Sequence, residues 1–383
     1  MKLKTIDYSQ YIGKPEEWRL SEASFGDTNL VVGRNAAGKT RTLNVVKGLA
    51  ELLSMRQQLH YRSGNYDVIF EGDKERIAYT LKYDDGHVKE EKLRINDKKV
   101  LTRGPDGSGR IRAEEIGKDI RFQTPVNEVA ACAKRDAIQH PFLDPLYEWG
   151  KSLVHFCFGT SLGKDIFVTL GEKESVNKID DQALLSDTNQ VQMVFRKGRQ
   201  KFGKEFVEAI KRDMKTLDYQ ITNIGIGAPT SLVFTGLAAP AVGLFVEEAG
   251  LRARIDQGEM SQGMFRSLSV IIQVNYVLKA RTSKCILIDD IGEGLDYERS
   301  SSLVKLLMKK AEKNAIQLFM ATNDRFIMNS VPLEHWSVVN RYGSICSILN
   351  RENSPKVFED FELTGLGNFD FFTSGYYLRS ETK

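Results

Sequence analysis

A phosphate-binding pattern, GxxxxGK[ST], occurs near the amino terminus as Gly33-Arg34-Asn35-Ala36-Ala37-Gly38-Lys39-Thr40. In this pattern successive backbone N–H groups point into a concavity that holds a phosphate, and the loop continues into a helix amino terminus. Lys39 is expected to place its charge on the β- and γ-phosphates, and the Thr40 hydroxyl is expected to ligate Mg²⁺. The chemistry indicated is binding of a nucleoside triphosphate with magnesium. The residue after the pattern, Arg41, has no expected role in this binding.

The residues on either side of this loop support the interpretation. Asn29-Leu30-Val31-Val32 predicts a buried strand before the loop. After the loop, apolar residues recur at helical spacing: Leu43, Val46, Leu49 and Leu53. Strand, loop and helix therefore follow in the order that phosphate binding requires. A glycine-rich turn without a ligand is the alternative, but such a turn rarely has both flanks.

A second apolar run ends in two carboxylates. Cys285-Ile286-Leu287-Ile288 predicts a buried strand, and Asp289-Asp290 follows it. A metal-holding carboxylate is expected at the end of a strand in the same sheet, which favours Asp289 as a Mg²⁺ ligand. Asp290 could then polarise the water that attacks the phosphate. Two adjacent aspartates could also simply cap a loop.

These motifs, with two further segments, resemble those of ABC-type ATPases, specifically the soluble branch that contains the SMC, RecF and OLD-like proteins and the AAA-like ATP-binding proteins of bacterial defence loci. Met260-Ser261-Gln262-Gly263-Met264-Phe265-Arg266 resembles that family's signature loop and helix, and Gly292-Glu293-Gly294-Leu295-Asp296 stands at the spacing of its D-loop. The resemblance covers residues 1–130 and 250–345. It implies an α/β fold, a P-loop ABC-ATPase head with an antiparallel accessory β-sheet and a compact helical insert.

The resemblance also implies an assembly. In this family the signature serine and glycine contact the γ-phosphate that the opposite subunit's phosphate loop holds. Ser261 and Gly263, with Gln262 between them, would therefore act in trans, and Asp296 would contact the same nucleotide. The implied unit is a homodimer or higher oligomer with ATP and Mg²⁺ between subunits, which ATP binding closes and hydrolysis opens. For Ser261-Gln262-Gly263 alone, an ordinary helix N-cap turn is the alternative.

Two positions depart from the family pattern. The family's catalytic acid is normally glutamate, whereas Asp290 is one methylene shorter and should position water less well. Its switch histidine should follow the next strand, predicted at Ile316-Gln317-Leu318-Phe319-Met320-Ala321-Thr322, but Asn323 stands there and cannot carry charge. The expected catalytic residues are thus Lys39, Asp290 and Asn323, with Glu293 as an auxiliary acid. We expect slow ATP hydrolysis.

An accessory sheet is predicted between the motifs. Ile77, Tyr79, Leu81 and Tyr83 alternate before a turn at Asp85-Gly86, a second turn is expected at Asn96-Asp97, and Gly104–Gly109 should form a surface loop. The family's metal-sensing glutamine follows such a region. Gln123, within Arg121-Phe122-Gln123-Thr124-Pro125, is therefore the residue expected to contact nucleotide and metal, and Gln139 is the reserve.

Three segments are expected: an N-terminal ATPase lobe over residues 1–139, a mostly helical insert over 140–250, and a C-terminal ATPase lobe over 251–383. The insert lacks the sustained heptads of long coiled-coil arms. One amphipathic helix is predicted in it from Phe202, Phe206, Ile210, Met214, Leu217 and Ile221. Basic residues near this helix could grip phosphates or form a solvated face: Arg196, Lys197, Arg199, Lys201, Lys204, Lys211, Arg212 and Lys215.

Composition indicates a folded, intracellular chain. The 383 residues carry a net charge of +3, which is less basic than a dedicated nucleic-acid binder would be. Met1–Thr5 lacks a signal-peptide core, and the apolar stretch Leu232–Val246 is too short to span a bilayer, so we expect a cytoplasmic protein. The cysteines and histidines are dispersed without metal-ligand spacing. Aromatic residues after Asn350 should pack on the chain's own sheet or on a partner.

Too few residues follow Asn350 for the Toprim nuclease domain that OLD-like relatives carry. We therefore expect an ATPase that senses or controls a separate effector, a nuclease or toxin, in an anti-phage defence system. One alternative is a RecF-like repair clamp that binds DNA in an ATP-dependent manner. Another is a scaffold that binds ATP without hydrolysing it.

Overall fold

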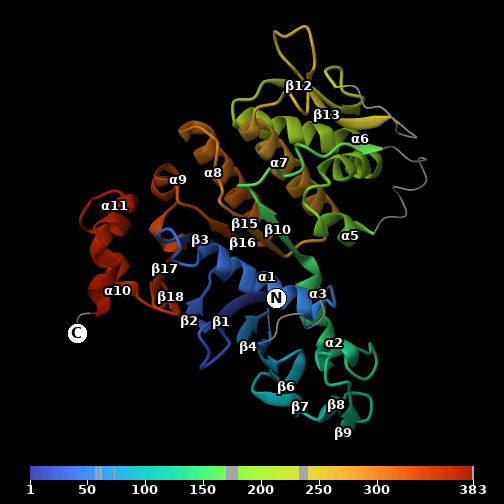
Figure 1. The fold of residues 1–383 in the computed structure, drawn as a ribbon, viewed down its shortest axis with the longest axis vertical. Coiled ribbons are helices and arrows are strands. Elements are labelled where there is room, and N and C mark those ends of the chain that lie inside the picture. The colour runs from blue at the N-terminus through green and yellow to red at the C-terminus, as the bar shows by residue number, and fades with distance from the viewer. Residues whose placement is uncertain (57–58, 60–62, 73, 170–179, 233–239, 382–383) are drawn as a thin grey trace. The chain divides into compact units, whose positions relative to one another are not determined.

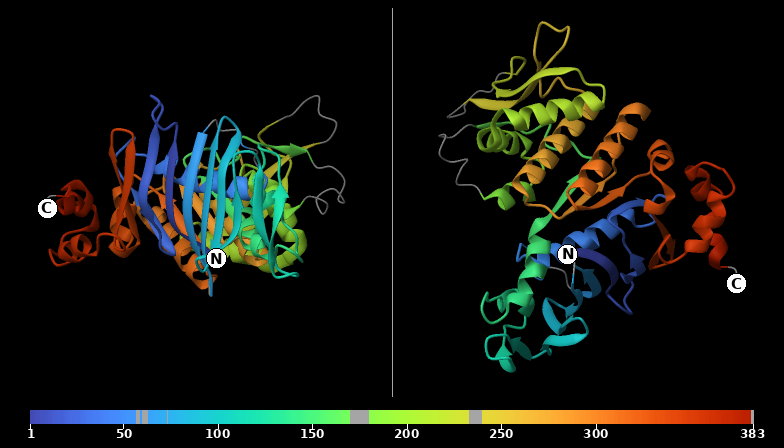
Figure 2. Two further views of the ribbon diagram at one scale, coloured as in Figure 1. Left: turned by 90° about the horizontal axis from the view of Figure 1, so that it is seen from below. Right: turned by 180° about the vertical axis from the view of Figure 1, so that it is seen from behind.

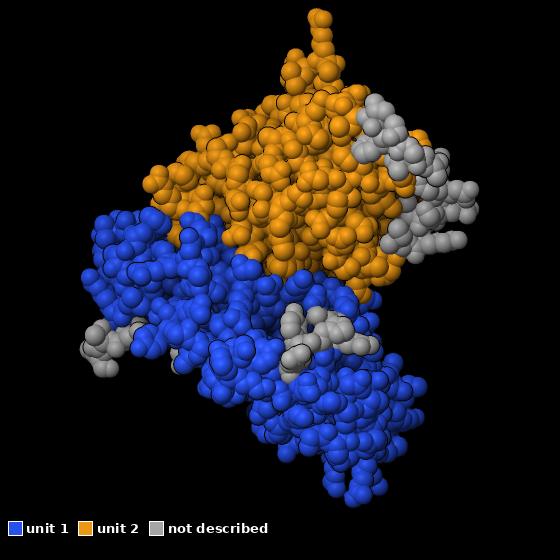
Figure 3. Space-filling model, viewed as in Figure 1, with its two compact units in different colours: residues 1–153, 317–323, 332–383 blue, residues 154–316, 324–331 orange. Residues whose placement is uncertain are grey.

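The computed structural model describes residues 1–56, 59, 63–72, 74–169, 180–232 and 240–381. These residues form two compact units (Figure 3): unit 1 contains residues 1–153, 317–323 and 332–383, and unit 2 contains 154–316 and 324–331. This division differs from the three segments expected. The first segment ends at Leu153, and the signature and acidic motifs lie in the same unit as most of the insert.

Unit 1 is built on one long sheet with the strand order β16-β3-β17-β18-β2-β1-β4-β5-β6-β7-β8-β9 (Figures 1 and 2). The strand β3 pairs in parallel with β16 and β17, whereas β1 and the strands β4 to β9 form an antiparallel meander. The strand bounds are β1 Lys2–Gln10, β2 Trp18–Ser24, β3 Thr28–Val32, β4 Ser63–Glu71, β5 Arg76–Asp84, β6 His87–Ile95, β7 Lys98–Arg103, β8 Ser108–Ala113, β9 Lys118–Gln123, β16 Gln317–Ala321, β17 Trp336–Tyr342 and β18 Ile345–Asn350.

The antiparallel strands follow directly from sequence pattern. In β5 the alternating residues Ile77, Tyr79, Leu81 and Tyr83 are buried while their neighbours are not. Both expected hairpin turns have positive φ at two consecutive residues, 51° and 71° at Asp85-Gly86 and 47° and 64° at Asn96-Asp97. These angles match the two-residue turns that suit the twist of a hairpin. The predicted loop at Gly104–Gly109 is shorter than expected, because Ser108 and Gly109 already belong to β8.

The helix α1, Lys39–Leu53, follows β3 and packs closely against α3, Asp144–Ser152. A β-carbon on Gly150 would be 2.5 Å from the carbonyl oxygen of Ala50, so the two helices touch at a position where only glycine fits. Between them in sequence lie the short helices α2, Ala130–Ala133, and η1, Pro141–Leu143. The phosphate-loop helix is therefore held along its side by the unit's own backbone.

The aromatic residues at the carboxyl end pack on their own unit. After β18 come α10, Pro355–Glu362, α11, Asn368–Thr373, and η3, Tyr376–Glu381, and the short helix η2, Leu333–His335, precedes β17. Phe358, Phe361 and Phe371 have no exposed surface, and the ring of Phe371 lies 6.3 Å from that of Trp336. Of the two expected fates, packing on the chain's own sheet is the one that the structure shows.

Unit 2 combines long helices with two small groups of strands. Its helices are α5, Asp181–Ser186, α6, Val191–Thr216, α7, Gln262–Ala280, α8, Tyr297–Lys313, and α9, Arg325–Ser330. β10, Leu153–Cys157, neighbours β15, Cys285–Asp289. A separate four-stranded sheet joins β11, Val168–Thr169, β12, Ile221–Gly227, β13, Ala241–Glu248, and β14, Ile255–Asp256. The insert is thus less helical than predicted, and residues 233–239 of the apolar stretch Leu232–Val246 lie outside the described residues.

The prediction of one continuous helix from Phe202 to Ile221 was wrong at both ends. The helix α6 begins at Val191 and is broken at Gly203, where φ is 63° and ψ is −145°, and Ile221 is the first residue of β12. The ring centroids of Phe195 and Phe206 are only 6.1 Å apart. Eleven helical residues would span about 16 Å, so the chain folds back at Gly203. Periodicity alone misses this break because the apolar residues keep helical spacing on both sides of it.

Three of the eight basic residues near α6 form ion pairs in the described part of the chain. Lys197 and Lys201 lie 2.5 Å and 2.9 Å from the carboxylate of Asp181, and Lys211 lies 2.9 Å from Glu208. Tyr276 on α7 donates a hydrogen bond to the same Asp181. Burial raises the pKa of Asp181, but hydrogen bonds from Lys197, Lys201 and Tyr276 outweigh it and lower the pKa to about 2. Lys197 and Lys201 therefore serve the packing of α5, α6 and α7.

Two remaining expectations concern membranes and cysteines. Among the described residues, no helix has the length and apolar character needed to cross a bilayer. Cys132, Cys285 and Cys346 are buried and Cys157 is half-buried, and all four are free thiols.

Candidate functional site

The phosphate loop, residues 33–40, lies in unit 1 between β3 and α1, as its flanks predict. Gly38 precedes the first helical residue with φ of 112°, which glycine adopts readily. A β-carbon on Gly38 would be 3.1 Å from Sγ of Cys346, and one on Gly33 would be 2.9 Å from the carbonyl oxygen of Val339. The glycines of the pattern are thus required by the close approach of β17 and β18 to the loop.

The helix α1 leaves its first N–H groups available. An α-helix has no internal acceptors for them, and no side chain caps α1 at Gly38. Lys39 is 7% exposed, and its Nζ donates to the carbonyl oxygens of Gly33, at 3.0 Å, and Arg34, at 3.3 Å. Thr40 is exposed. An uncapped helix amino terminus beside a buried ammonium group is suited to a polyphosphate anion.

The far side of the loop is held by two residues that the sequence did not single out. Arg341 on β17 donates from Nη1 to the carbonyl oxygen of Ala36, at 3.1 Å, and Cys346 on β18 donates from Sγ to that of Ala37, at 3.2 Å. Burial raises the pKa of the Cys346 thiol, which keeps the S–H available as a donor. Ala36 has φ of 61°, an unusual value for a residue with a side chain. The backbone of the loop is therefore shaped by hydrogen bonds from both strands of one hairpin.

In unit 2 the acidic pair stands at the end of β15. Asp289 is buried, and Asp290 is half-buried with φ of 53°, a left-handed conformation that aspartate tolerates. The carbonyl oxygen of Asp289 accepts a hydrogen bond from the N–H of Phe158, at 2.9 Å. Phe158 begins the loop Phe158–Thr160, which directly follows β10. Asp289 and Asp290 thus lie beside a loop that the sequence analysis did not assign to the site.

Gly159, in the loop Phe158–Thr160, lies between the two acids expected to act in catalysis. A β-carbon there would be 2.8 Å from Oε2 of Glu293 and 3.3 Å from Oδ2 of Asp290. Both carboxylates therefore border the same small residue, and Glu293 is exposed. This arrangement is compatible with Glu293 assisting Asp290.

The signature turn, residues 261–263, opens α7. Ser261 is exposed and is the N-cap, and its hydroxyl oxygen accepts from the N–H of Met264 at 3.2 Å. The Gln262 amide donates to the carbonyl oxygen of Thr160, at 3.4 Å. Gly263 lies against Gly294 of the D-loop segment, residues 292–296. Within unit 2 the signature turn, the D-loop segment and the loop Phe158–Thr160 therefore form one contiguous cluster.

The last two residues expected in the site are Asp296 and Asn323, of which Asp296 caps a helix. Asp296 is exposed and caps α8, and the hydrogen bond from the backbone N–H of Arg299 lowers the pKa of Asp296. Asn323 is exposed and follows β16 in unit 1, as a residue in the switch position should. Asp324, the next residue, caps α9.

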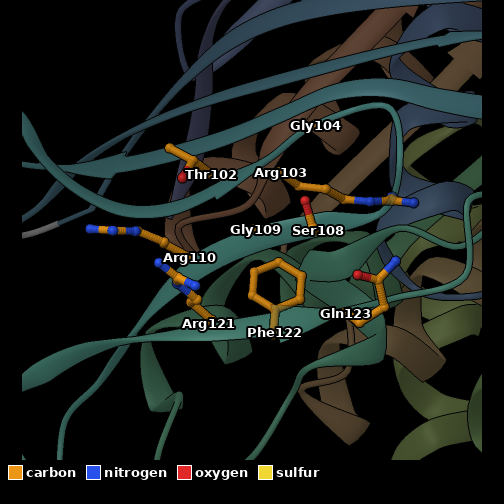
Figure 4. A pocket seen from close by; sticks show the side chains of 9 residues that line it. All are labelled: Thr102, Arg103, Gly104, Ser108, Gly109, Arg110, Arg121, Phe122 and Gln123. Atoms are coloured by element: carbon orange, nitrogen blue, oxygen red, sulfur yellow. The ribbon is translucent and has the colours of Figure 1, made fainter.

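Gln123 does not lie near the phosphate loop. It ends β9, the edge strand, which stands ten places from β3 in the sheet order of unit 1. Its amide donates to the carbonyl oxygen of Asp106, at 2.8 Å, and it lines a surface pocket of about 730 Å³ with residues of β7 and β8 (Figure 4). The reserve, Gln139, bonds to Glu115 near the same strands. The structure therefore does not bring Gln123 to the phosphate loop, because five antiparallel strands separate β1 from the edge strand β9.

The residues present fit ATP with magnesium. Across the described parts of the chain, no group of three or more histidine, cysteine, aspartate or glutamate residues could hold a metal ion by itself. Mg²⁺ bound with nucleotides typically has one or two protein ligands and takes its other ligands from phosphates and water. A hydroxyl such as Thr40 and a single carboxylate such as Asp289 are ligands of that kind.

Comparison with known proteins identifies the fold. No protein-family model matches the chain, and no curated protein matches it in sequence. A similar solved structure is an SMC head bound to the C-terminal winged-helix domain of ScpA, with a TM-score of 0.52 and 12% identity over 93% of this chain and 100% of the other. Two others are the SMC head domain of Thermotoga maritima, with a TM-score of 0.45 and 14% identity over 91% and 99%, and a Pyrococcus furiosus SMC head with an extended coiled coil, with a TM-score of 0.44 and 12% identity over 94% and 99%. The expected fold class is confirmed: the chain has the α/β fold of an SMC head.

Proposed function

We propose that this chain is an ABC-type ATPase of the SMC-like kind, which binds and slowly hydrolyses ATP, forms nucleotide-sandwiched dimers and controls a separate effector. The observation that carries the proposal is the amino terminus of α1, where an uncapped helix end meets the buried Nζ of Lys39 and the exposed hydroxyl of Thr40. Bound Mg²⁺ would neutralise phosphate charge there. Lys39 would orient the phosphates, and Thr40 and Asp289 would hold the metal.

Dimerisation through shared nucleotides is supported by the signature turn. Ser261 is exposed and its hydroxyl oxygen accepts a backbone hydrogen bond from Met264, so its O–H can donate to a ligand outside the unit. Gly263 and Gln262 are held against the D-loop segment and the Thr160 carbonyl, which fixes the direction of the turn. Contact of this turn with a phosphate on a second copy would close a dimer when ATP binds.

Slow hydrolysis is proposed from the two unusual residues. Asp290 has a shorter side chain than glutamate, and Asn323 cannot act as a charged switch. The proximity of Glu293 to Gly159 offers a second acid, which would support measurable rather than absent turnover.

The test of this function is an ATPase assay with three proteins. We expect wild-type turnover below about 1 s⁻¹, the low end of ordinary enzymes. Lys39→Met should bind ATP about 10- to 150-fold more weakly. Asp290→Asn should bind ATP, accumulate as dimers on a sizing column and hydrolyse at least tenfold more slowly. A wild-type rate of many per second would contradict the slow switch, and absence of nucleotide binding would overturn the ATPase assignment. Undiminished assembly and biological activity in Asp290→Asn would favour the non-hydrolysing scaffold.

The effector, a nuclease or toxin of an anti-phage system, is proposed from the resemblance of the motifs to ATP-binding proteins of defence loci. It is tested by purifying tagged wild type and Asp290→Asn from the native locus in MgATP. A stoichiometric nuclease or toxin subunit would support an ATP-gated complex, and its enrichment on Asp290→Asn would indicate release after hydrolysis. Recovery of DNA without a protein partner would contradict this role.

A second candidate, the RecF-like DNA clamp, is favoured by one surface. Arg110 on β8 and Arg121 on β9 are exposed cross-strand partners in the wall of the pocket in Figure 4. Like charges placed opposite each other destabilise a sheet. Among the described residues neither has an ion-pair partner, whereas Arg112 nearby lies 4.0 Å from Asp119. An uncompensated pair of arginines suits a phosphate backbone better than the paired lysines of α6 do.

This candidate is tested with the double variant Arg110→Gln/Arg121→Gln, and with Lys201→Gln/Lys211→Gln as the matched control. If the chain clamps DNA, the arginine variant alone should weaken ATP-dependent DNA binding and reduce the salt dependence of the affinity. Salt-insensitive or absent DNA binding by wild type would exclude the clamp and leave the ATPase proposal unaffected.

A further inference from the structure

The side chain of Arg266 joins three separate segments of unit 2. Arg266 lies on α7, one turn after Gly263, and is 8% exposed. Its Nε donates to the carbonyl oxygen of Thr160 at 2.7 Å, its Nη2 to that of Gly159 at 2.8 Å, and its Nη1 to that of Glu293 at 2.9 Å. All three distances are in the range of strong charge-assisted hydrogen bonds. The guanidinium thus connects α7 with the loop Phe158–Thr160 and with Glu293 of the D-loop segment.

The hydrogen bonds of Arg266 are of an uncommon kind for a buried cation. Buried arginines usually pair with a carboxylate. Among the described residues, the hydrogen-bond partners of this guanidinium are backbone carbonyl oxygens, and it forms no ion pair. Backbone acceptors have fixed positions, so a planar fork of donors can hold two loops in a single relative geometry. A lysine ammonium could not satisfy three acceptors spread across that plane in the same way.

The surrounding residues are shaped to accept this side chain. A β-carbon on Gly294 would be 3.1 Å from Nη1 of Arg266, and φ at Gly294 is 80°. Gln262, in the signature turn, donates to the same Thr160 carbonyl that Nε of Arg266 contacts. Gln262 and Arg266 therefore share one acceptor, the carbonyl oxygen of Thr160, and both lie on the same helix, α7.

The loop that Arg266 holds is the one that borders the acids. The N–H of Phe158 is bonded to the Asp289 carbonyl, and Gly159 lies against Asp290 and Glu293. A shift of α7 would therefore move the loop Phe158–Thr160 and the Glu293 backbone together, and with them the two carboxylates. Small displacements of this size matter, because about 1 Å of misplacement can lower a catalytic rate by about 100-fold.

We propose that Arg266 is a positioning residue that transmits the position of the signature turn to Asp290 and Glu293. The inference rests on the proposed ATPase function and adds how the signature turn would influence hydrolysis in its own subunit. Engagement of Ser261 and Gly263 by a phosphate on a second copy moves the amino-terminal end of α7. Arg266 passes that movement through the carbonyls of Gly159, Thr160 and Glu293 to the acids that position the attacking water.

The test replaces Arg266 by lysine, which keeps the charge and loses the planar fork. The matched control is Arg254→Lys, since Arg254 also bonds to a backbone carbonyl, that of Ala228, within unit 2 but away from the acids. For Arg266→Lys we expect a kcat 10- to 100-fold lower than wild type, with KM for ATP and ATP-dependent dimer formation changed less than twofold. For Arg254→Lys we expect an unchanged kcat. Arg266→Gln is the second variant, for use if the lysine variant does not fold.

The outcomes separate this inference from the proposed function. If wild type hydrolyses ATP and both Arg266 variants keep a kcat within twofold of wild type, the positioning role is wrong while the ATPase assignment stands. Equal losses of kcat, nucleotide binding and thermal stability in Arg266→Lys would show a structural role only and would also overturn the inference. Failure of wild type to bind or hydrolyse ATP would instead overturn the proposed function itself.

Discussion

Gly263 of the signature turn lies against the carbonyl oxygen of Gly294 so closely that a β-carbon on Gly263 would be 2.5 Å from that oxygen. The same β-carbon would be 2.9 Å from Cδ2 of Leu295. The signature glycine is therefore required within its own subunit, in addition to the contact with nucleotide that the motif implies. Sequence comparison of the motif would assign it only the second role.

Replacing Gly263 by alanine should lower both stability and turnover. Overpacking at a rigid backbone neighbour costs about 1–3 kcal/mol, and relief of the clash would displace the D-loop segment. Urea unfolding and an ATPase assay measure the two effects. Gly258→Ala is the control, because a β-carbon there would meet its nearest neighbour at 3.8 Å. Equal stability of the two variants would contradict the tight packing described.

Removing the Lys39 ammonium should weaken nucleotide binding. Loss of charge-assisted hydrogen bonds worth about 1.5–3 kcal/mol corresponds to a 10- to 150-fold higher Kd for ATP. Isothermal titration of Lys39→Met measures this, and Lys47→Met on the same helix is the control, since Lys47 pairs with Glu51 on the surface. An unchanged Kd for ATP in Lys39→Met would show that the phosphate loop does not bind the nucleotide.

Gly203 should not accept alanine although space is free around it. No atom lies within 4 Å of the added β-carbon, but φ of 63° with ψ of −145° is a conformation that side chains strongly disfavour. We expect Gly203→Ala to lower the free energy of unfolding by about 1–3 kcal/mol. Lys204→Ala, at the exposed neighbouring position, should have little effect. A stable Gly203→Ala variant would mean that α6 can run straight.

The Asp181 cluster should make stability depend on acid pH. The folded-state pKa of Asp181 is lowered to about 2 from an ordinary value of 3.8, so the carboxylate stabilises the fold above about pH 4 and the contribution disappears as pH falls through 2. Asp181→Asn should therefore be less stable than wild type at pH 6, and the difference should shrink towards pH 3. Denaturant titrations at both pH values measure it.

The control for this pH effect is Glu208→Gln, which breaks an exposed pair with Lys211. Surface pairs contribute little, so the free energy of unfolding of this variant should match wild type at either pH. A pH-independent difference between Asp181→Asn and wild type would show that Asp181 contributes through packing rather than through charge.

The local features of the fold could be predicted from the amino-acid sequence. The strand, phosphate loop and helix around Gly33–Thr40 depend on apolar spacing and on glycines, and the hairpins of the accessory sheet depend on alternation and on turns such as Asp85-Gly86. These patterns depend on residues that are close together in the chain, so they can be recognised from the sequence alone. The fold class, an α/β head like that of SMC proteins, was implied by the resemblance of the motifs to those of ABC-type ATPases and is confirmed.

The long-range contacts could not be predicted from the sequence, because they form only when the chain is folded. Strand order placed Gln123 at the far edge of the sheet, although its place after a β-rich region favoured it as a site residue. Close packing joined Arg266 to Gly159, 107 residues away in the chain. The break at Gly203 folded one predicted helix back on itself. Each depends on which surfaces meet after the chain has folded, and neither residue type nor spacing along the sequence records that.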